Sequence, residues 1–205
     1  MPVYLLDCSP LTDPDTLGAV LPYLDKKRQA RIHRQMHPLK KAQTAAAGLL
    51  LHEVFGDVSY RIGEHGKPYL AHGDTHFNIT HSGQWVALAT ANCEIGLDMQ
   101  TVAPLRPAVM RRCFTQEQRD WIGNDPLRFA RLWTVKEAYI KMTGTGLSVP
   151  ARDVPVTIPL RDGLDSAANC YWQFFTCPDD TPITLCNTIA QPTELIVYTN
   201  IKDLL

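Results

Sequence analysis

The pattern of apolar positions is strongest in the middle of the chain, where residues 129–141 repeat at helical spacing without a glycine or proline. Gly144 and Gly146 follow this stretch and favour the end of a helix there. One apolar face carries Leu132, Val135, Tyr139 and Met142, and a second strip carries Phe129, Trp133 and Ile140. The polar stripe between them consists of Thr134, Glu137 and Lys141. A helix that is apolar around most of its circumference is buried, so its carboxylate and ammonium need partners.

The rest of the chain alternates helical and strand-like patterns, which predicts an α/β (α+β) fold. Helical patterns cover residues 15–24, 25–34, 42–55 and 108–113. Thr115 and Gln118 form a capping box that opens another helix. Strand-like runs cover residues 3–8, 58–62, 76–80, 85–90 and 95–100, and later 154–158, 171–176, 183–187 and 194–199. The proline-containing linker 101–107 predicts a boundary between two subdomains, residues 1–103 and 104–205.

The strand at residues 95–100 carries candidate chemistry, and its pattern predicts a hairpin with residues 85–90. Side chains alternate along a strand, so one face carries Ile95, Leu97 and Met99 and the other carries Gly96, Asp98 and Gln100. Asp98 and Gln100 would form a compact pair of oxygen donors beside open space at Gly96. A purely structural aspartate at a strand end is the competing interpretation for Asp98.

Composition narrows the class of protein. The 205 residues include 20 Lys+Arg and 21 Asp+Glu, a balance that indicates neither a nucleic acid nor a membrane as partner. The N-terminus lacks the basic region and long apolar run of a signal peptide, and no apolar run reaches membrane-spanning length. None of the six cysteines forms a C-x-x-C pair. These features predict a cytoplasmic protein with reduced thiols.

Several basic residues are candidates for binding an anion. Arg28 and Arg31 share one face of a basic helical segment and could together bind an anion. The competing interpretation is that this face is simply exposed to solvent. A glycine-rich turn projects Lys67, and His81 follows a strand. A histidine in such a place is often a structural hydrogen-bonding residue, so a structural alternative stays open there.

Three segments, residues 77–82, 95–100 and 133–141, together resemble the signature of the 4′-phosphopantetheinyl transferases, specifically the larger, monomeric Sfp-type group. The Gly-Lys-Pro-Tyr turn that ends at Tyr69 and the Gly-Leu-Ser-Val-Pro run that ends at Pro150 also fit this group. The resemblance extends from the basic helical segment to about Pro150. Beyond that point the sequence predicts only a generic β-rich tail.

The resemblance implies transfer of the 4′-phosphopantetheine arm of coenzyme A to a serine of an apo acyl or peptidyl carrier protein. Adenosine 3′,5′-bisphosphate is the other product. The implied fold has two pseudo-symmetric subdomains with coenzyme A in the cleft between them, and the implied cofactor is Mg²⁺. The sequence does not name the carrier, which could serve fatty-acid, polyketide or nonribosomal peptide synthesis.

The resemblance assigns catalytic roles to Glu137, Lys141 and Asp98, and metal ligation to Asp98, Gln100 and Glu137. Glu137 is a metal ligand, a general base for the serine proton, or both. The implied contacts with coenzyme A are Arg28, Arg31, Thr44, Lys67, Thr80, His81, Lys136 and Lys141. Gln100 stands where the family usually has a glutamate, which removes one negative charge from the metal site.

Other interpretations stay open on the sequence alone. Glu137 and Lys141, four residues apart, are spaced as a common structural ion pair of helices. The chain is alternatively a non-catalytic module that binds coenzyme A or a carrier protein, or an acyltransferase that uses acyl-coenzyme A. A candidate docking patch for an acidic carrier consists of Arg106, Arg111 and Arg112 beside Val109 and Met110.

Overall fold

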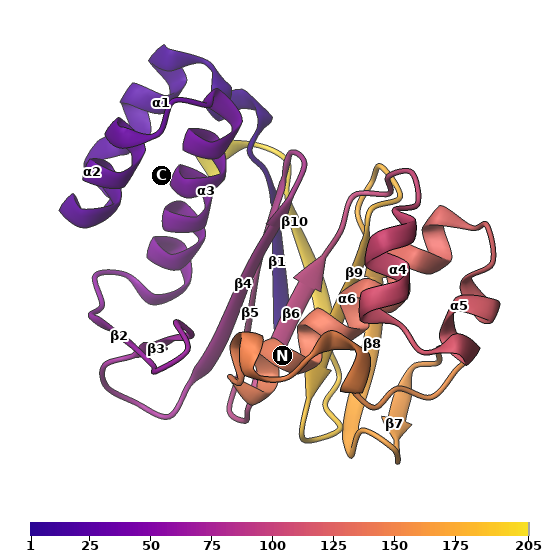
Figure 1. Cartoon of the computed structure of the whole chain (residues 1–205). Helices are drawn as coiled ribbons and strands as arrows, with labels where there is room; N and C mark the ends of the chain where they lie inside the picture. The colour runs from indigo at the N-terminus through magenta and orange to yellow at the C-terminus, as the bar shows by residue number, and fades with distance from the viewer. Residues whose placement is uncertain (205) are drawn as a thin grey trace.

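The computed structural model describes residues 1–204 and shows a mixed α/β fold with two separate four-stranded sheets (Figure 1). The helices of the N-terminal half lie on one side of the strands, and those of the C-terminal half lie on the other side. The predicted α/β class is confirmed, whereas pseudo-symmetry of the two halves stays a prediction. No helix in residues 1–204 is long and apolar enough to cross a membrane.

The first sheet has the strand order β10-β1-β5-β4 and combines both ends of the chain. β1 (Pro2–Asp7) lies antiparallel to β5 (Trp85–Ala91), which pairs antiparallel with β4 (His76–Ser82). β10 (Glu194–Tyr198) pairs in parallel with β1. Part of the β-rich tail therefore completes a sheet that begins at the N-terminus.

Three helices cover the first sheet: α1 (Pro14–Val20), α2 (Lys26–Arg34) and α3 (Pro38–Phe55). The Ala- and Leu-rich middle of α3 is buried, as its pattern predicts. Leu49 and Leu50 of this helix share one apolar core with residues of β1, β5 and the C-terminal turn. Burial of this apolar face is the main force that holds the helices on the sheet.

The second sheet has the strand order β6-β9-β8-β7, and all of its neighbouring strands are antiparallel. Its strands are β6 (Ile95–Met99), β7 (Gly163–Asp165), β8 (Cys170–Thr176) and β9 (Pro182–Asn187). Both faces of β6 are buried. β6 is therefore an edge strand of its sheet that is covered on both faces by other parts of the molecule.

Short elements complete the chain. β2 (Tyr60–Ile62) and β3 (Pro68–Leu70) form a separate ribbon near the end of α3 (Figure 1). Single 3-10 turns occupy Ser9–Thr12, Leu21–Tyr23, Gly146–Ser148, Ala151–Asp153 and Ile201–Leu204.

Three helices belong to the C-terminal half: α4 (Pro107–Cys113), α5 (Gln116–Ile122) and α6 (Pro126–Thr143). The capping box between Thr115 and Gln118 at the start of α5 is confirmed. α6 is the long helix that the apolar pattern predicts, and it packs against β6 and β9 of the second sheet.

β6 and α6 are in close backbone contact at Gly96. A Cβ atom built on this residue would lie 1.9 Å from the carbonyl oxygen of Ala138 and 2.4 Å from the backbone nitrogen of Met142. The expectation of open space beside Gly96 is therefore wrong, because the backbone of α6 fills that space. Because Gly96 has no side chain, the backbones of β6, which carries Asp98, and α6, which carries Lys141, can come into direct contact.

Two strand predictions are also wrong. Residues 95–99 do not form a hairpin with residues 85–91, because β5 pairs with β1 and β4, whereas β6 pairs with β9. Residues 154–158 form no strand. An apolar pattern indicates that a strand is buried, but it does not encode which distant strand will be its partner.

The two sheets cross the predicted boundary between residues 1–103 and 104–205. β6 precedes this boundary but pairs with β9, which follows it. β10 follows the boundary but pairs with β1. The division into two subdomains stays a prediction, and the exchanged strands β6 and β10 join the two parts.

Candidate active site

A cavity of about 520 Å³ is lined by residues from α2, α3, β4, β6 and α6. Most of the predicted site residues line it, namely Arg28, Arg31, Thr44, Thr80, His81, Asp98, Gln100, Glu137 and Lys141. These residues come from segments that are more than one hundred positions apart in the sequence, and the fold brings them to one place. Lys67 and Lys136 are the predicted residues that do not line this cavity.

Asp98 on β6 is the more buried of the two acids in the cavity, with 7 % of its surface exposed. Its Oδ1 accepts a hydrogen bond from Lys141 Nζ at 2.6 Å and another from Thr80 Oγ1 at 3.2 Å. Lys141 also donates to Thr80 Oγ1 and to the carbonyl oxygen of Leu97, each at 3.1 Å. Burial raises the pKa of Asp98, and the charge of Lys141 opposes this rise.

Glu137 on α6 lines the same cavity and is only partly buried. Burial raises its pKa, the negative charge of Asp98 raises it further, and Lys141 lowers it. Among residues 1–204, no ion pair joins Glu137 to Lys141, whose ammonium pairs with Asp98 instead. The interpretation of Glu137 and Lys141 as a simple structural ion pair is therefore not supported.

Gln100 is the third oxygen-bearing residue of the acidic part of the cavity. Its Nε2 donates a hydrogen bond to the carbonyl oxygen of Thr101 at 3.0 Å. Within the described part of the chain, its own amide oxygen accepts no hydrogen bond. That oxygen is therefore available to a ligand in the cavity.

The donor set at this place fits Mg²⁺. Within residues 1–204 no group of three or more His, Cys, Asp and Glu side chains is arranged as a metal site. An ion in this cavity would have only the carboxylates of Asp98 and Glu137 and the amide of Gln100 as protein ligands. Mg²⁺ commonly binds one or two carboxylates together with waters and substrate phosphates. Asp98 and Glu137 both have raised pKa values, and a cation between them would relieve the cost of their charges.

Arg28 of α2 is held in the cavity wall by its packing against α3. Its Nη1 donates to the carbonyl oxygen of Thr44 at 3.1 Å. A Cβ atom built on Gly48 would lie only 2.4 Å from Cδ of Arg28, so the glycine provides the room for this side chain. Burial lowers the pKa of Arg28, and the residue remains a cation because its ordinary pKa is so high.

His81 at the end of β4 lies in a cationic environment. Burial lowers its pKa, and the positive charges of Lys40, Lys141 and Arg31 lower it further. Three cations around one imidazole create a positive potential that favours an anion at this part of the cavity. Lys40 is a residue that the sequence analysis does not assign to the site.

Two predicted residues lie elsewhere. Lys136 is fully buried, donates to the carbonyl oxygen of Ala151 at 2.8 Å, and lies 5.5 Å from the ring centre of Phe114. Lys67 is also buried, and its ammonium pairs with Glu94 at 2.8 Å. Neither ammonium faces the cavity that contains Asp98.

The structure adds residues that the sequence analysis does not find. Gln43 lines the cavity and donates to the carbonyl oxygen of Gly83 at 2.7 Å. Trp133 also lines it, four residues before Glu137 on α6. The spacing between Trp133 and Glu137 is a usable signal, because residues four apart share a helix face. No comparable signal distinguishes Gln43 from the other polar residues of α3.

Two carboxylates and a lysine that face a basic cavity are chemically suited to a phosphorylated ligand and a divalent cation. The family model of the 4′-phosphopantetheinyl transferase superfamily matches residues 94–186 of the chain. This range includes β6 and α6, and therefore Asp98, Glu137 and Lys141.

Individual relatives agree with the family model. A 4′-phosphopantetheinyl transferase of Bacillus subtilis is 32 % identical over 143 residues, which are 63 % of this chain and 62 % of that relative. The 4′-phosphopantetheinyl transferase Sfp of Bacillus subtilis strain 168 is 27 % identical over 203 residues, 89 % of this chain and 90 % of Sfp. The 4′-phosphopantetheinyl transferase gsp of Aneurinibacillus migulanus is 32 % identical over 99 residues, 46 % of this chain and 41 % of gsp.

Proposed function

We propose that this protein transfers the 4′-phosphopantetheine arm of coenzyme A to a serine of an apo acyl or peptidyl carrier protein. Adenosine 3′,5′-bisphosphate is released. The observation that carries this proposal is that Asp98 on β6 and Glu137 on α6 line one cavity, with Lys141 paired to Asp98 at 2.6 Å. The names of the relatives Sfp and gsp support the same reaction class.

The basic residues of the cavity suit the phosphates of coenzyme A. Arg28 and Arg31 offer guanidinium groups, which match the oxygen geometry of a phosphate. Thr44 and His81 line the same cavity. The imidazole of His81 can donate a hydrogen bond, whereas the Thr44 hydroxyl donates to Gln35 Oε1 and to the carbonyl oxygen of Lys40, so a phosphate would have to displace these acceptors. We assign these four residues to the 3′-phosphate and the adenosine end. Lys141 is then placed for the phosphate that is transferred.

In the transfer, the serine oxygen bonds to the phosphorus that carries the pantetheine arm. The bond from this phosphorus to the bridging oxygen of the pyrophosphate breaks, and adenosine 3′,5′-bisphosphate leaves with that oxygen and the electron pair. Glu137 accepts the serine proton, and its raised pKa makes it a stronger base than an ordinary glutamate. Lys141 stabilises the negative charge on the transferred phosphate.

Asp98, Gln100 and Glu137 are the residues that would hold Mg²⁺, which neutralises the charge of the pyrophosphate when it is bound. The amide of Gln100 supplies an oxygen without a full negative charge. We therefore expect weaker ion binding than at a site with three carboxylates, while the reaction class stays the same.

The test is incubation of the purified protein with coenzyme A, Mg²⁺ and an apo carrier protein, followed by mass spectrometry of the carrier. A gain equal to phosphopantetheine on the serine supports the transferase. A gain of an acyl group from acyl-coenzyme A would point to the acyltransferase instead. Binding of coenzyme A without any gain on carriers from fatty-acid, polyketide and peptide synthesis would point to a binding module.

We also propose that α4 contributes to docking of the carrier. Arg106, Arg111 and Arg112 are exposed, whereas Met110 packs against the apolar core beneath. Reversal of charge at Arg111 and Arg112 together should raise the Michaelis constant for the carrier and spare the constant for coenzyme A. If the variant and the wild type have the same Michaelis constant for the carrier at low salt, these arginines do not contribute to docking.

The monomeric state and the cytoplasmic location stay predictions. All six cysteines are free thiols, which suits a reducing compartment. Light scattering of the purified protein and fractionation of the cells that make it would check both.

A further inference from the structure

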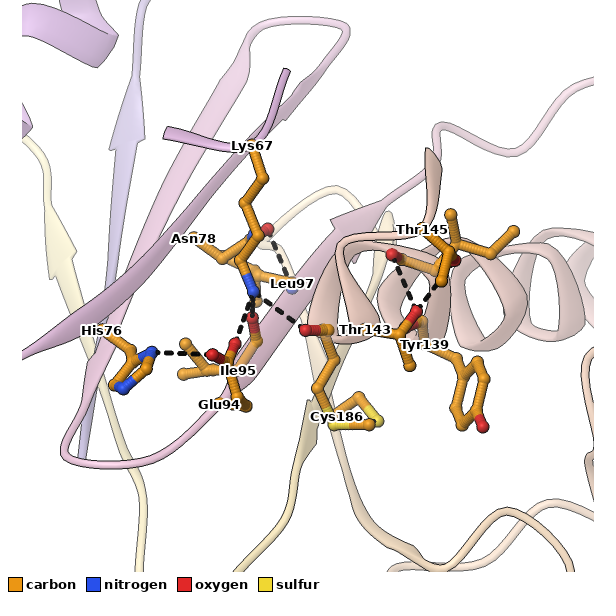
Figure 2. A network of polar contacts seen from close by, with 12 residues as sticks. Lys67, His76, Asn78, Glu94, Ile95, Leu97, Tyr139, Thr143, Thr145 and Cys186 are labelled. Atoms are coloured by element: carbon orange, nitrogen blue, oxygen red, sulfur yellow. Dashed lines mark hydrogen bonds and ion pairs between the residues drawn. The ribbon is translucent and has the colours of Figure 1, made fainter. Parts of the chain in front are cut away.

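The ammonium of Lys67 lies at a junction of three chain segments (Figure 2). Its Nζ donates to Glu94 Oε2 at 2.8 Å, to the carbonyl oxygen of Ile95 at 3.3 Å and to the carbonyl oxygen of Met142 at 2.9 Å. Glu94 Oε1 also lies 3.4 Å from Nδ1 of His76 on β4. The side chain of Lys67 is 7 % exposed.

These contacts leave Lys67 no donor for a phosphate. A lysine ammonium has three N–H donors, and each can be assigned to one of the three acceptors. The ammonium also lies 5.5 Å from the ring centre of Tyr69, which is a further attractive contact for a cation. A phosphate could reach Lys67 only if the ammonium left its present partners.

The acceptors show what the ammonium does. Met142 belongs to the last turn of α6, where backbone carbonyl groups have no partner within the helix. A cation at this end of a helix is favourable because the helix dipole is negative there. Ile95 is the first residue of β6, so one ammonium joins the end of α6 to the start of β6.

The joined elements are those that carry the catalytic pair. Lys141 immediately precedes Met142 on α6, and Asp98 follows Ile95 by three positions on β6. The two elements are in backbone contact at Gly96, which lies between the junction and Asp98. A shift of α6 along β6 would therefore change the 2.6 Å contact between Lys141 Nζ and Asp98 Oδ1.

We propose that Lys67 is a positioning residue that fixes the last turn of α6 against β6 and so holds Lys141 on Asp98. This inference rests on the proposed transferase function, and it replaces the contact with coenzyme A that the resemblance implies for Lys67. If Lys67 has this role, the effect of removing it should not depend on whether the substrate carries the 3′-phosphate of coenzyme A. Loss of Lys67 should impair coenzyme A and 3′-dephospho-coenzyme A equally.

The test uses Lys67→Met, which keeps the length of the side chain and removes its charge and donors. We expect kcat to fall about tenfold with both substrates, because small displacements of catalytic groups have effects of at least this size. The ratio of the Michaelis constants for the two substrates should equal the wild-type ratio. His81→Ala is the matched contrast, and its penalty should shrink with dephospho-coenzyme A.

A second readout does not depend on activity. Amide hydrogen exchange at residues 141–146 should become faster in Lys67→Met, and it should stay at the wild-type rate in Lys202→Met, which removes an exposed lysine far along the chain. Glu94→Gln removes one charged partner and keeps the lysine. This milder variant should lower kcat in the same direction by a smaller factor, which keeps the test usable if Lys67→Met folds poorly.

Two results would overturn the inference. One is a rise of the Michaelis constant in Lys67→Met for coenzyme A but not for dephospho-coenzyme A, which would assign Lys67 to the phosphate. The other is unchanged exchange at residues 141–146. If the wild-type protein modifies no carrier, the proposed function fails, whereas the exchange experiment still decides whether Lys67 fixes the end of α6.

Discussion

Two lysines on α6 occupy opposite environments. The side chain of Lys141 is 30 % exposed, faces the cavity and pairs with Asp98. Lys136 is fully buried, donates to the carbonyl oxygen of Ala151 and lies over the ring of Phe114. Five positions on a helix correspond to a rotation of about 140°, so the two side chains leave different faces. The face of the helix, rather than nearness in sequence to Glu137, the proposed catalytic base, separates the environments of the two lysines.

The largest expected effect comes from removing each ammonium in turn. Lys141→Met should lower kcat by about 10² to 10³, because a charge that stabilises the transition state is lost. Lys136→Met should leave kcat per folded molecule within about threefold of the wild type, because this ammonium touches no reacting group. Carrier modification at saturating coenzyme A measures both, with folded fractions determined by circular dichroism. Equal losses of kcat in the two variants would show that the two ammonium groups do not differ in role.

Gly96→Ala tests the backbone contact between β6 and α6, which fixes the orientation of the helix that carries Lys136 and Lys141. The added methyl would lie 1.9 Å from the carbonyl oxygen of Ala138, and backbone cannot move aside as a side chain can. We expect the free energy of unfolding to fall by at least about 3 kcal/mol, above most overpacking substitutions. Denaturant titration measures the change.

Gly18→Ala is the matched control for this substitution. Gly18 lies in α1 with no atom near its Cβ position, so alanine should be neutral or stabilise the protein by about 0.5–1 kcal/mol. A small change at Gly96, comparable to that at Gly18, would mean that β6 and α6 are less closely packed than described.

The pH dependence of stability should show the effect of burying Lys136. Burial lowers its pKa from 10.5 to about 8. Between these two pH values the unfolded chain binds a proton at this lysine that the folded chain does not, so the free energy of unfolding rises with pH. The rise is at most about 3 kcal/mol, at 1.36 kcal/mol for each pH unit. The rise in the free energy of unfolding is complete near pH 10.5, the ordinary pKa of a lysine.

Lys136→Met should lack this rise. The difference in the free energy of unfolding between wild type and variant, measured by denaturant titration from pH 7 to 10.5, removes the titration of tyrosines common to both proteins. A difference that is constant across this range would show that Lys136 is charged in the folded protein at all of these pH values.

The sequence predicts helices better than strand partners, and the physical reason is distance along the chain. The apolar faces, Pro126 and Gly144 determine α6 locally. The partner of β6 is β9, more than eighty residues further on, and one of the two partners of β1 is β10 near the C-terminus. A buried strand pattern is compatible with many partners, so the hairpin expected between residues 85–90 and 95–100 does not form.

The contacts of Lys67 also could not be predicted, because they too involve residues that are distant in the sequence. A lysine in a glycine-rich turn is expected to be exposed, and its sequence neighbours give no sign of burial. One acceptor belongs to Met142, 75 positions away, and only the folded chain brings it to the ammonium. Asp98 and Glu137, by contrast, are predictable as candidates because each is a carboxylate in an otherwise apolar element.

A smaller effect is expected at Gln100, which follows β6 and lines the same cavity as Glu137 and Lys141. Gln100→Glu adds a negative charge beside Asp98, so the Mg²⁺ concentration for half-maximal rate should fall about threefold to tenfold. Gln100→Ala should raise this concentration, but by far less than a substitution of Asp98 would. A metal titration of carrier modification measures both. If neither variant moves the curve, Gln100 has only a structural role.

The shared catalytic role proposed for Asp98 and Glu137 is tested most directly by a double-substitution cycle on these two residues, read as the rate of carrier modification at saturating Mg²⁺. Asp98→Asn and Glu137→Gln keep the shape of each side chain and remove its charge. Each should lower kcat by about 10² to 10³, and the double variant should be little slower than either single one, because residues that act as a unit are not additive. Near-normal transfer by either single variant, with the chain folded, would contradict the assignment of these two carboxylates to one catalytic site.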